Sequence, residues 1–249
     1  MVERDTLVSH LDALLAAATF RDYAPNGLQV EGRPNIRRLI TGVTASQALI
    51  DAAVAAQADA ILVHHGYFWR NEPQVLTGVR RRRVHALLKH DISLLAYHLP
   101  LDAHPDLGNN AGLGRVLEVM ADGRFGEQSL GWIGNTDAPL SLAELVQRLQ
   151  AALDRQPLVL GDQGQCLRRV AWCTGGAQGL FGDAIAAGAD VYVTGEVSEQ
   201  CTHMARESGV SFISAGHHAT ERFGVQSLAG HLAERFAIEC RYVDIDNPV

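Results

Sequence analysis

The feature that most limits the fold of this chain is an internal repeat within its 249 residues. Residues 37–40 (RRLI) match residues 168–171 (RRVA) at an offset of 131 (168 − 37), and residues 58–63 (ADAILV) match residues 189–194 (ADVYVT) at the same offset without a gap. After a loop of different length, residues 92–96 (ISLLA) match residues 210–214 (VSFIS). The repeat indicates duplication of one βαβαβ lobe. The alternative is that all βαβ units share a similar order of strand, glycine and helix.

Strand-like and helix-like segments alternate through both repeats. Apolar runs predict strands at residues 39–43, 60–63, 92–97, 170–174, 191–194, 210–214 and 239–245. Helical patterns occur at residues 6–19, 45–57, 79–90, 142–153, 180–187, 198–208 and 227–236. Ser141 and Glu144 are spaced as a capping box for the fourth of these helices. The alternation predicts an α/β protein with largely parallel sheets. We expect a first lobe at 1–122, a connecting segment at 123–165 and a second lobe at 166–249, packed as one unit.

Composition and charge exclude several classes of function. Apolar residues make up 47% of the chain and charged residues 20%, which is typical of a globular protein. The net charge of -7 argues against non-specific binding to nucleic acid or anionic membranes, since both require basic patches. No apolar run reaches the ~18 residues of a membrane span, and residues 1–5 lack a signal-peptide pattern. The four cysteines are scattered, as in a reduced cytoplasmic protein, which is the location we expect.

Residues that bind metal ions follow several of the predicted strands. Ligands bind at the carboxyl ends of parallel strands, and His64 and His65 stand at one such end. Asp102 lies between two histidines after another strand, and His217 and Glu221 are spaced to share one face of a helix. Imidazole and carboxylate suit divalent ions, so these five residues predict a two-metal centre with ions ~3.5–4 Å apart. The alternative is a set of hydrogen-bonded core histidines, which would require a coincidence at several strand ends.

Other residues allow a structural or a functional interpretation. His10, His85, His90, His203 and His231 lie in helical segments and are expected to be structural. The basic run at 80–83 is usually a solvated helix face, although it would hold a substrate phosphate if it bordered the cleft. The aromatic run at 67–69 fits either a stacked planar ligand or a core or subunit contact. Gly175-Gly176 lacks the pattern of a dinucleotide site, and Asn26-Gly27 fits a turn.

Five ordered motifs resemble the GTP cyclohydrolase I type 2 family, a NIF-three-like family of dinuclear-metal proteins. They are residues 26–31 (NGLQVE), 63–69 (VHHGYFW), 98–104 (HLPLDAH) with 108–111 (GNNA), 195–196 (GE) and 215–221 (AGHHATE). The resemblance runs from about residue 23 to the C-terminus and fits the short bacterial form. It implies two similar, intertwined α/β lobes with a metal pair in the cleft between them, and a ring-shaped homohexamer.

The resemblance also implies roles for single residues. The family's metal ligands match His64, His65, Asp102, His217 and Glu221, which would hold two divalent ions per subunit. His98 and Glu196 match a family histidine and glutamate near the cleft, where they are candidates for proton transfer or for supporting the ligands. The residue types do not distinguish Zn, Fe, Mn and Ni.

Three functions follow from this pattern. The first is hydrolysis by a metal-activated water, with attack on the purine ring of GTP as the candidate reaction. The second is hydrolysis of a phosphate ester by the same centre. The third is a non-catalytic hexamer that handles metal or acts as a scaffold. The expected partners are further copies of the chain and a nucleotide or another phosphate-containing small molecule, without a membrane or nucleic acid.

Overall fold

The computed structural model describes residues 1–249, which form two compact units. The first comprises Met1–Leu101 and Gly224–Asp246, and the second comprises Asp102–Phe223 and Asn247–Val249. The domain boundaries predicted at residues 122 and 165 do not coincide with this division. The chain returns to the first unit near its end, where strand β13 (Glu239–Tyr242) pairs in parallel with β4 (Arg38–Thr44).

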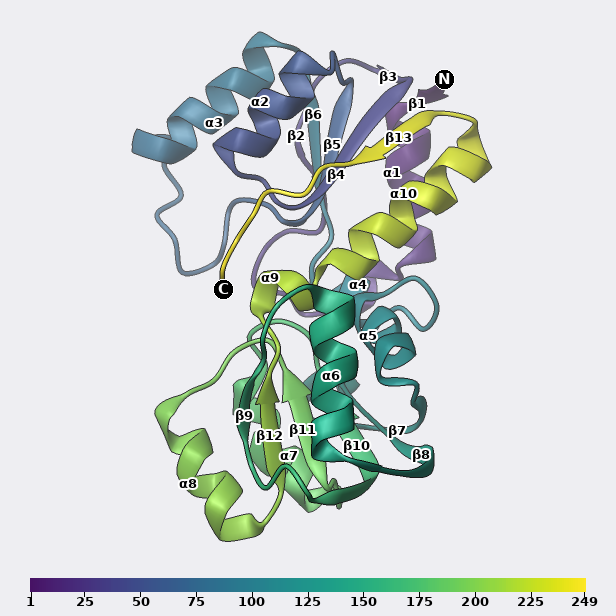
Figure 1. Ribbon diagram of the computed structural model, residues 1–249. Coiled ribbons are helices and arrows are strands. Elements are labelled where there is room, and N and C mark those ends of the chain that lie inside the picture. Colours follow the sequence, from purple (N-terminus) through teal and green to yellow (C-terminus); the bar gives the residue numbers. More distant parts are fainter. The chain divides into compact units, whose positions relative to one another are not determined.

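The first unit is built on a five-stranded sheet of order β13-β4-β5-β6-β2 (Figure 1). β4, β5 (Ala60–His65) and β6 (Ser93–Ala96) are parallel, as predicted, and β2 (Gly27–Val30) is antiparallel to β6. The other elements are β1 (Val2–Glu3), β3 (Asn35–Ile36), α1 (Arg4–Leu14), the 3-10 turn η1 (Ala17–Thr19), α2 (Gln47–Ala55), α3 (Gly78–Lys89), α4 (Leu99–Ala103) and α10 (Arg222–Phe236). α1 ends earlier than predicted because Ala16 adopts a left-handed conformation with φ 48°.

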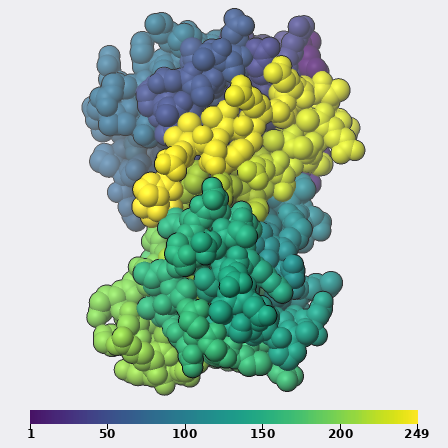
Figure 2. Space-filling model, viewed as in Figure 1, coloured from purple at the N-terminus to yellow at the C-terminus, as the bar shows by residue number.

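Alternate residues of each strand point to opposite faces of this sheet. Ile61 and Val63 of β5 belong to one buried cluster with Leu49 of α2 and Leu87 of α3. Figure 1 shows α2 and α3 together on this side and α1 and α10 on the other side. The chain's last strand lies on the surface of this unit, where its atoms are yellow in Figure 2. The sheet is therefore covered on both faces, which holds the ends of β5 and β6 in fixed positions.

The second unit is built on a six-stranded sheet of order β7-β8-β10-β11-β12-β9. β10 (Cys166–Trp172), β11 (Val191–Thr194) and β12 (Ser211–Ser214) are parallel and confirm three predicted strands. The segment expected to connect the lobes contributes strands of this same sheet. The other elements are α5 (Asn109–Leu117), β7 (Met120–Phe125), η2 (Glu127–Ser129), β8 (Gly131–Ser141), α6 (Leu142–Leu153), β9 (Leu158–Leu160), η3 (Gln178–Leu180), α7 (Phe181–Ala186), α8 (Glu199–Ser208) and α9 (His217–Thr220).

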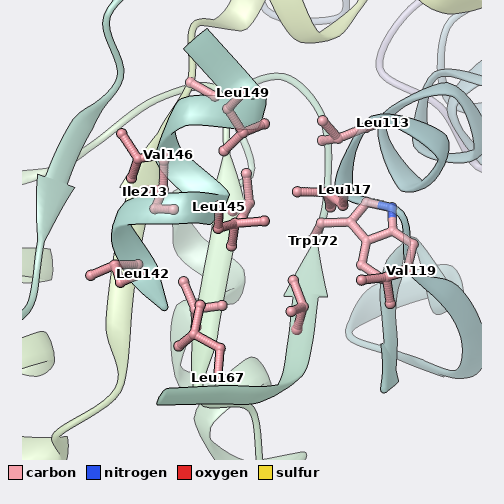
Figure 3. Packing of buried hydrophobic residues seen from close by; sticks show 14 of the residues in the cluster. Leu113, Leu117, Val119, Leu142, Leu145, Val146, Leu149, Leu167, Trp172 and Ile213 are labelled. Atoms are coloured by element: carbon pink, nitrogen blue, oxygen red, sulfur yellow. The ribbon is translucent and has the colours of Figure 1, made fainter. Parts of the chain in front are cut away.

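The core of the second unit lies between its sheet and helices α5 and α6 (Figure 3). Leu145 and Leu149 of α6 face Leu113 and Trp172, all with side chains in one buried cluster. The capping box predicted for α6 is present, since Ser141 and Glu144 exchange side-chain and backbone hydrogen bonds. The opposite face of the sheet packs against α7 and α8 in a second cluster. None of the helices in either unit combines the length and the apolar character that crossing a bilayer requires.

The same carboxylate interaction occurs in both units. Asp59 Oδ2 accepts hydrogen bonds from the backbone N–H groups of residues 37 and 38, at 2.8 and 2.9 Å. Asp190 Oδ2 accepts the corresponding bonds from residues 168 and 169, both at 2.8 Å. Asp59 directly precedes β5 and binds the beginning of β4, and Asp190 directly precedes β11 and binds the neighbouring strand β10. The same side chain makes the same hydrogen bonds at equivalent positions of the repeat. This supports duplication over the alternative that all βαβ units share a similar order of strand, glycine and helix.

We predict that Asp59→Ala and Asp190→Ala each lower the free energy of unfolding by about 1–3 kcal/mol, because two backbone N–H donors lose a charged acceptor. Urea unfolding measures the change. Glu207→Ala, at an exposed position of α8, is the matched control and should shift stability by less than about 0.5 kcal/mol. Equal effects of the three variants would contradict a structural role for the repeated carboxylate.

Candidate metal centre

Three histidine rings of the first unit gather at the ends of neighbouring strands. His64 and His65 are the last two residues of β5, and His98 follows β6. Their ring centroids are 4.6 Å apart for His64 and His65, 5.0 Å for His64 and His98, and 5.7 Å for His65 and His98. One ring nitrogen from each histidine lies within 4.8 Å of the others. The parallel pairing of β5 with β6 thus brings together residues that are 33 positions apart.

Each of these rings is oriented by a contact of its Nδ1 atom. His64 Nδ1 lies 3.0 Å from the Tyr97 carbonyl oxygen, which only accepts hydrogen bonds, so this nitrogen carries the proton. His98 Nδ1 lies 2.7 Å from Asp22 Oδ1, and His65 Nδ1 lies 3.1 Å from Thr44 Oγ1. With the proton on Nδ1, the lone pair of the imidazole is on Nε2. A hydrogen bond to a carbonyl or carboxylate is the usual support of a metal-binding histidine.

Asp22 is a positioning residue that sequence reasoning missed. Its carboxylate also accepts bonds from the backbone N–H of Leu99 and the side chain of Asn26, both at 3.0 Å. Asn26 in turn accepts a bond from the His98 backbone N–H at 2.8 Å. Burial raises the pKa of Asp22, but the hydrogen bonds from His98 and Asn26 outweigh it and lower this pKa to about 2. The loop at residues 22–27 therefore does more than turn the chain, since it holds His98 from two sides.

In the second unit, His217 is held between two carboxylates. The short helix α9 begins after Gly216, and its geometry brings Glu221 Oε2 to 3.1 Å from His217 Nε2, as the four-residue spacing predicted. On the other side of the ring, Glu196 Oε1 lies 2.7 Å from His217 Nδ1. Glu221 is buried and Glu196 is half-buried. Two carboxylates about one imidazole create a strong preference for positive charge at this position.

That preference is visible in the pKa of His217. Burial of the ring lowers the pKa, but the hydrogen bonds and charges of Glu221 and Glu196 raise it more, to about 9. At neutral pH the ring is therefore an imidazolium. A divalent cation at the Nε2 side would replace this proton and satisfy the same carboxylate, so metal binding here is coupled to proton release.

Asp102 belongs to the same unit and is fixed by two side chains. Its Oδ1 accepts hydrogen bonds from Asn109 Nδ2 at 2.8 Å and from Thr174 Oγ1 at 3.2 Å. The neighbouring thiol of Cys173 has a raised pKa, first because it is buried and then because the charges of Asp102 and Glu221 lie near it. Both carboxylates thus border the segment that follows β10.

Gly175 in that segment explains how Glu221 is seated. Its φ is +71°, and a Cβ atom built on it would lie 2.0 Å from Glu221 Oε1 and 3.3 Å from His217 Nε2. Its backbone N–H donates to Thr220 Oγ1 at 3.0 Å. Gly175 is therefore needed for the close approach of the backbone to the Glu221 carboxylate.

The histidines that are expected to be structural do not belong to the groups of candidate metal ligands. His203 pairs with Glu199 along the exposed face of α8 at 3.2 Å. His10 stacks on His231 with ring centroids 5.2 Å apart, and His85 and His90 are exposed. The remaining donors, imidazole nitrogen and carboxylate oxygen, are those that bind Zn, Fe, Mn or Ni, so they fit divalent ions.

Comparison with known proteins shows close relatives over the full chain. A family model described as Duf34/NIF3 (NGG1p interacting factor 3) matches residues 2–248. A Pseudomonas aeruginosa protein named "GTP cyclohydrolase 1 type 2 homolog" is 56% identical over 246 residues, covering 98% of this chain and 97% of the relative. A Yersinia pestis protein of the same name is 54% identical over 248 residues, covering 99% and 98%. A solved structure described as "protein ybgI, unknown function" is 45% identical, with a TM-score of 0.95 over 100% of both chains.

We predict that Gly175→Ala displaces Glu221 and weakens metal binding, because the added methyl group would overlap the carboxylate and because φ +71° strains any residue with a Cβ. Gly179→Ala is the control, since a Cβ there meets nothing within 4 Å. Elemental analysis after dialysis against a divalent metal measures the bound ions per chain. Equal metal content in both variants would show that Glu221 is not a ligand or is not seated by Gly175.

A second prediction concerns pH. The folded pKa of His217, about 9, exceeds its ordinary value of 6.5. The charged ring therefore contributes stability that is fully present below pH 6.5 and is lost as the pH rises through about 9. In chelator-treated protein, the stability difference between wild type and His217→Asn should shrink by about 2–3 kcal/mol over that range. Urea unfolding at a series of pH values measures it, and a difference that grows with pH would contradict the assignment.

Proposed function

The chain belongs to the Duf34/NIF3 family, and from this premise we propose that it is a hydrolase dependent on two divalent metal ions. The ligands in this proposal are His64, His65, Asp102, His217 and Glu221. The resemblance found in the sequence motifs is confirmed over nearly the whole chain by the family match and by relatives of 47–56% identity.

The observation that carries the proposal is the preset orientation of the donors. The Tyr97 carbonyl accepts the Nδ1 proton of His64, which places the imidazole lone pair on Nε2, and the two carboxylates around His217 favour a cation beside its Nε2. His64 and His65 form the ligand set of the first unit, and Asp102, His217 and Glu221 form that of the second. Neither set alone supplies enough ligands for two ions. Only three residues separate His98 from Asp102, so the short helix α4 joins one set to the other in the chain. This connection supports the proposal that both sets act on the same ions.

The supporting residues have separate tasks in the proposed reaction. Divalent ions bound at these donors would lower the pKa of a water molecule and supply a nucleophile at neutral pH. His98, whose Nδ1 is fixed by the ionised Asp22, presents Nε2 as a group that accepts and returns a proton. Glu196 binds His217 Nδ1 and accepts a bond from Gln178 at 3.1 Å, which favours a positioning role over proton transfer.

The candidate reaction is attack of water on the purine ring of GTP. It is supported by the name of the relatives, "GTP cyclohydrolase 1 type 2 homolog". Hydrolysis of a phosphate ester needs the same donors and differs only in the atom that is attacked. Assembly into a homohexameric ring, which the family resemblance implies, belongs to the proposal too, but the chemistry of the site does not depend on it.

The test is turnover of metal-loaded protein against GTP, other nucleotides and simple phosphate esters, beside Asp102→Ala. We expect wild-type turnover of at least one substrate and a loss of 100-fold or more in the variant, in the range of roughly 10²–10³ that removal of one electrostatic group costs. The variant should also lose at least one metal ion per chain by elemental analysis.

Asp106→Ala is the matched control, because this nearby carboxylate is exposed, and it should keep both metal and turnover. Two bound ions without turnover across the panel would contradict a hydrolase and favour the non-catalytic metal-handling or scaffold function. Two ions retained in Asp102→Ala would contradict the ligand assignment itself.

A further inference from the structure

A cavity of about 460 Å³ opens beside His65 in the first unit. This is within the size range of roughly 300–1,000 Å³ that binds small molecules. Its wall contains the Thr44 and His65 pair, which are hydrogen-bonded to each other, the indole of Trp69, and side chains from the start of α3. The cavity thus begins at a proposed metal ligand and extends to the basic helix.

The four consecutive arginines of α3 are not equivalent. Arg81 and Arg82 are exposed, whereas Arg80 and Arg83 are half-buried and line the cavity. Positions three apart lie on the same face of a helix, so the helix presents one pair to solvent and the other pair to the cavity. The interpretation of this run as a solvated face holds for Arg81 and Arg82 only.

Within the inward pair, Arg83 carries the uncompensated charge. Arg80 forms an ion pair with Glu72, donates to the Pro73 carbonyl and lies over the Phe68 ring, with its guanidinium carbon 5.8 Å from the centroid. Arg83 has no ion pair, and its buried Nε has no hydrogen-bond partner. Because it is costly to withdraw a cation from water without pairing it with an anion, this half-buried position is suited to an anionic ligand.

The remaining wall suits a flat, apolar group. Trp69 is fixed by a hydrogen bond from Nε1 to the Gly66 carbonyl at 3.2 Å. Its ring meets His98 edge to face, with centroids 4.9 Å apart, so it spans from the cavity to the histidine cluster. Val75 and Val79 add apolar surface. Besides the Arg80–Glu72 ion pair, Arg83 is thus the charged group of a wall that is otherwise largely aromatic and aliphatic, which is the usual make-up of a small-molecule site.

We propose that this cavity is the subsite for the phosphate group of a phosphorylated small-molecule substrate, with Arg83 as the phosphate-binding residue and Trp69 as the wall for its planar part. The inference rests on the proposed hydrolase function, because it places the substrate next to His65. A guanidinium donates two parallel hydrogen bonds to phosphate, which a single ammonium group does not reproduce.

The test compares binding of GMP and guanosine, which differ only in the phosphate, by isothermal calorimetry. In Arg83→Gln the affinity for GMP should fall by about tenfold or more, in line with the loss of a charge-assisted bond, while the affinity for guanosine is unchanged. Arg82→Gln on the same helix is the matched control and should bind both as wild type does. Arg83→Lys should recover only part of the loss.

The same titrations on chelator-treated protein separate this inference from the proposed function. Dependence on Arg83 that persists without metal supports the subsite even if turnover is never found. In metal-loaded protein, Arg83→Gln should raise KM for a phosphorylated substrate more than it lowers kcat. The inference is overturned if GMP binds no tighter than guanosine, or if Arg83→Gln and Arg82→Gln behave alike. Either result leaves the metal ligands untouched, and thermal unfolding of each variant verifies its fold.

Discussion

The rest of the candidate site depends on hydrogen bonds that the Nδ1 atoms of His64 and His98 make with fixed oxygen acceptors. The Tyr97 carbonyl determines which nitrogen of His64 holds the proton, and Asp22 does the same for His98. These contacts are possible because the parallel strands β5 and β6 end side by side and both faces of their sheet are covered. The His64 ring is thereby oriented before any cation binds, as a specific metal site requires, and the His98 ring is oriented for proton transfer.

The internal duplication places different residues at one structural position. At the offset of the repeat, His64 and His65 correspond to Gly195 and Glu196. In the first unit this strand end carries two candidate ligands, whereas in the second unit Glu196 orients the His217 ring through its Nδ1 atom. The two copies share the aspartate that precedes this strand. The strand end therefore carries candidate metal ligands in one copy and a residue that orients a candidate ligand in the other.

Sequence alone predicts the features that depend on local pattern. Short apolar runs located the parallel strands, and the rule that ligands gather at their carboxyl ends selected the histidines and acids. The role of Asp22 was not predictable, because it depends on contact with His98, which is 76 residues away. Gly175 was missed for the same reason, since its conformation matters only where Glu221 approaches it. For the arginine run, helical spacing pairs Arg80 with Arg83, but only tertiary packing shows which face is buried.

We propose that His64, His65, Asp102, His217 and Glu221 bind the same two metal ions. The most direct measurement is anomalous X-ray diffraction from crystals of the metal-loaded protein. We predict two anomalous peaks per chain, with Nε2 of His64 and a carboxylate oxygen of Asp102 or Glu221 among the atoms at about 2.0–2.2 Å, the usual bond length for such ions. Peaks coordinated by residues of one unit alone, or the absence of a peak near the five proposed ligands, would contradict the proposal that both units bind the same ions.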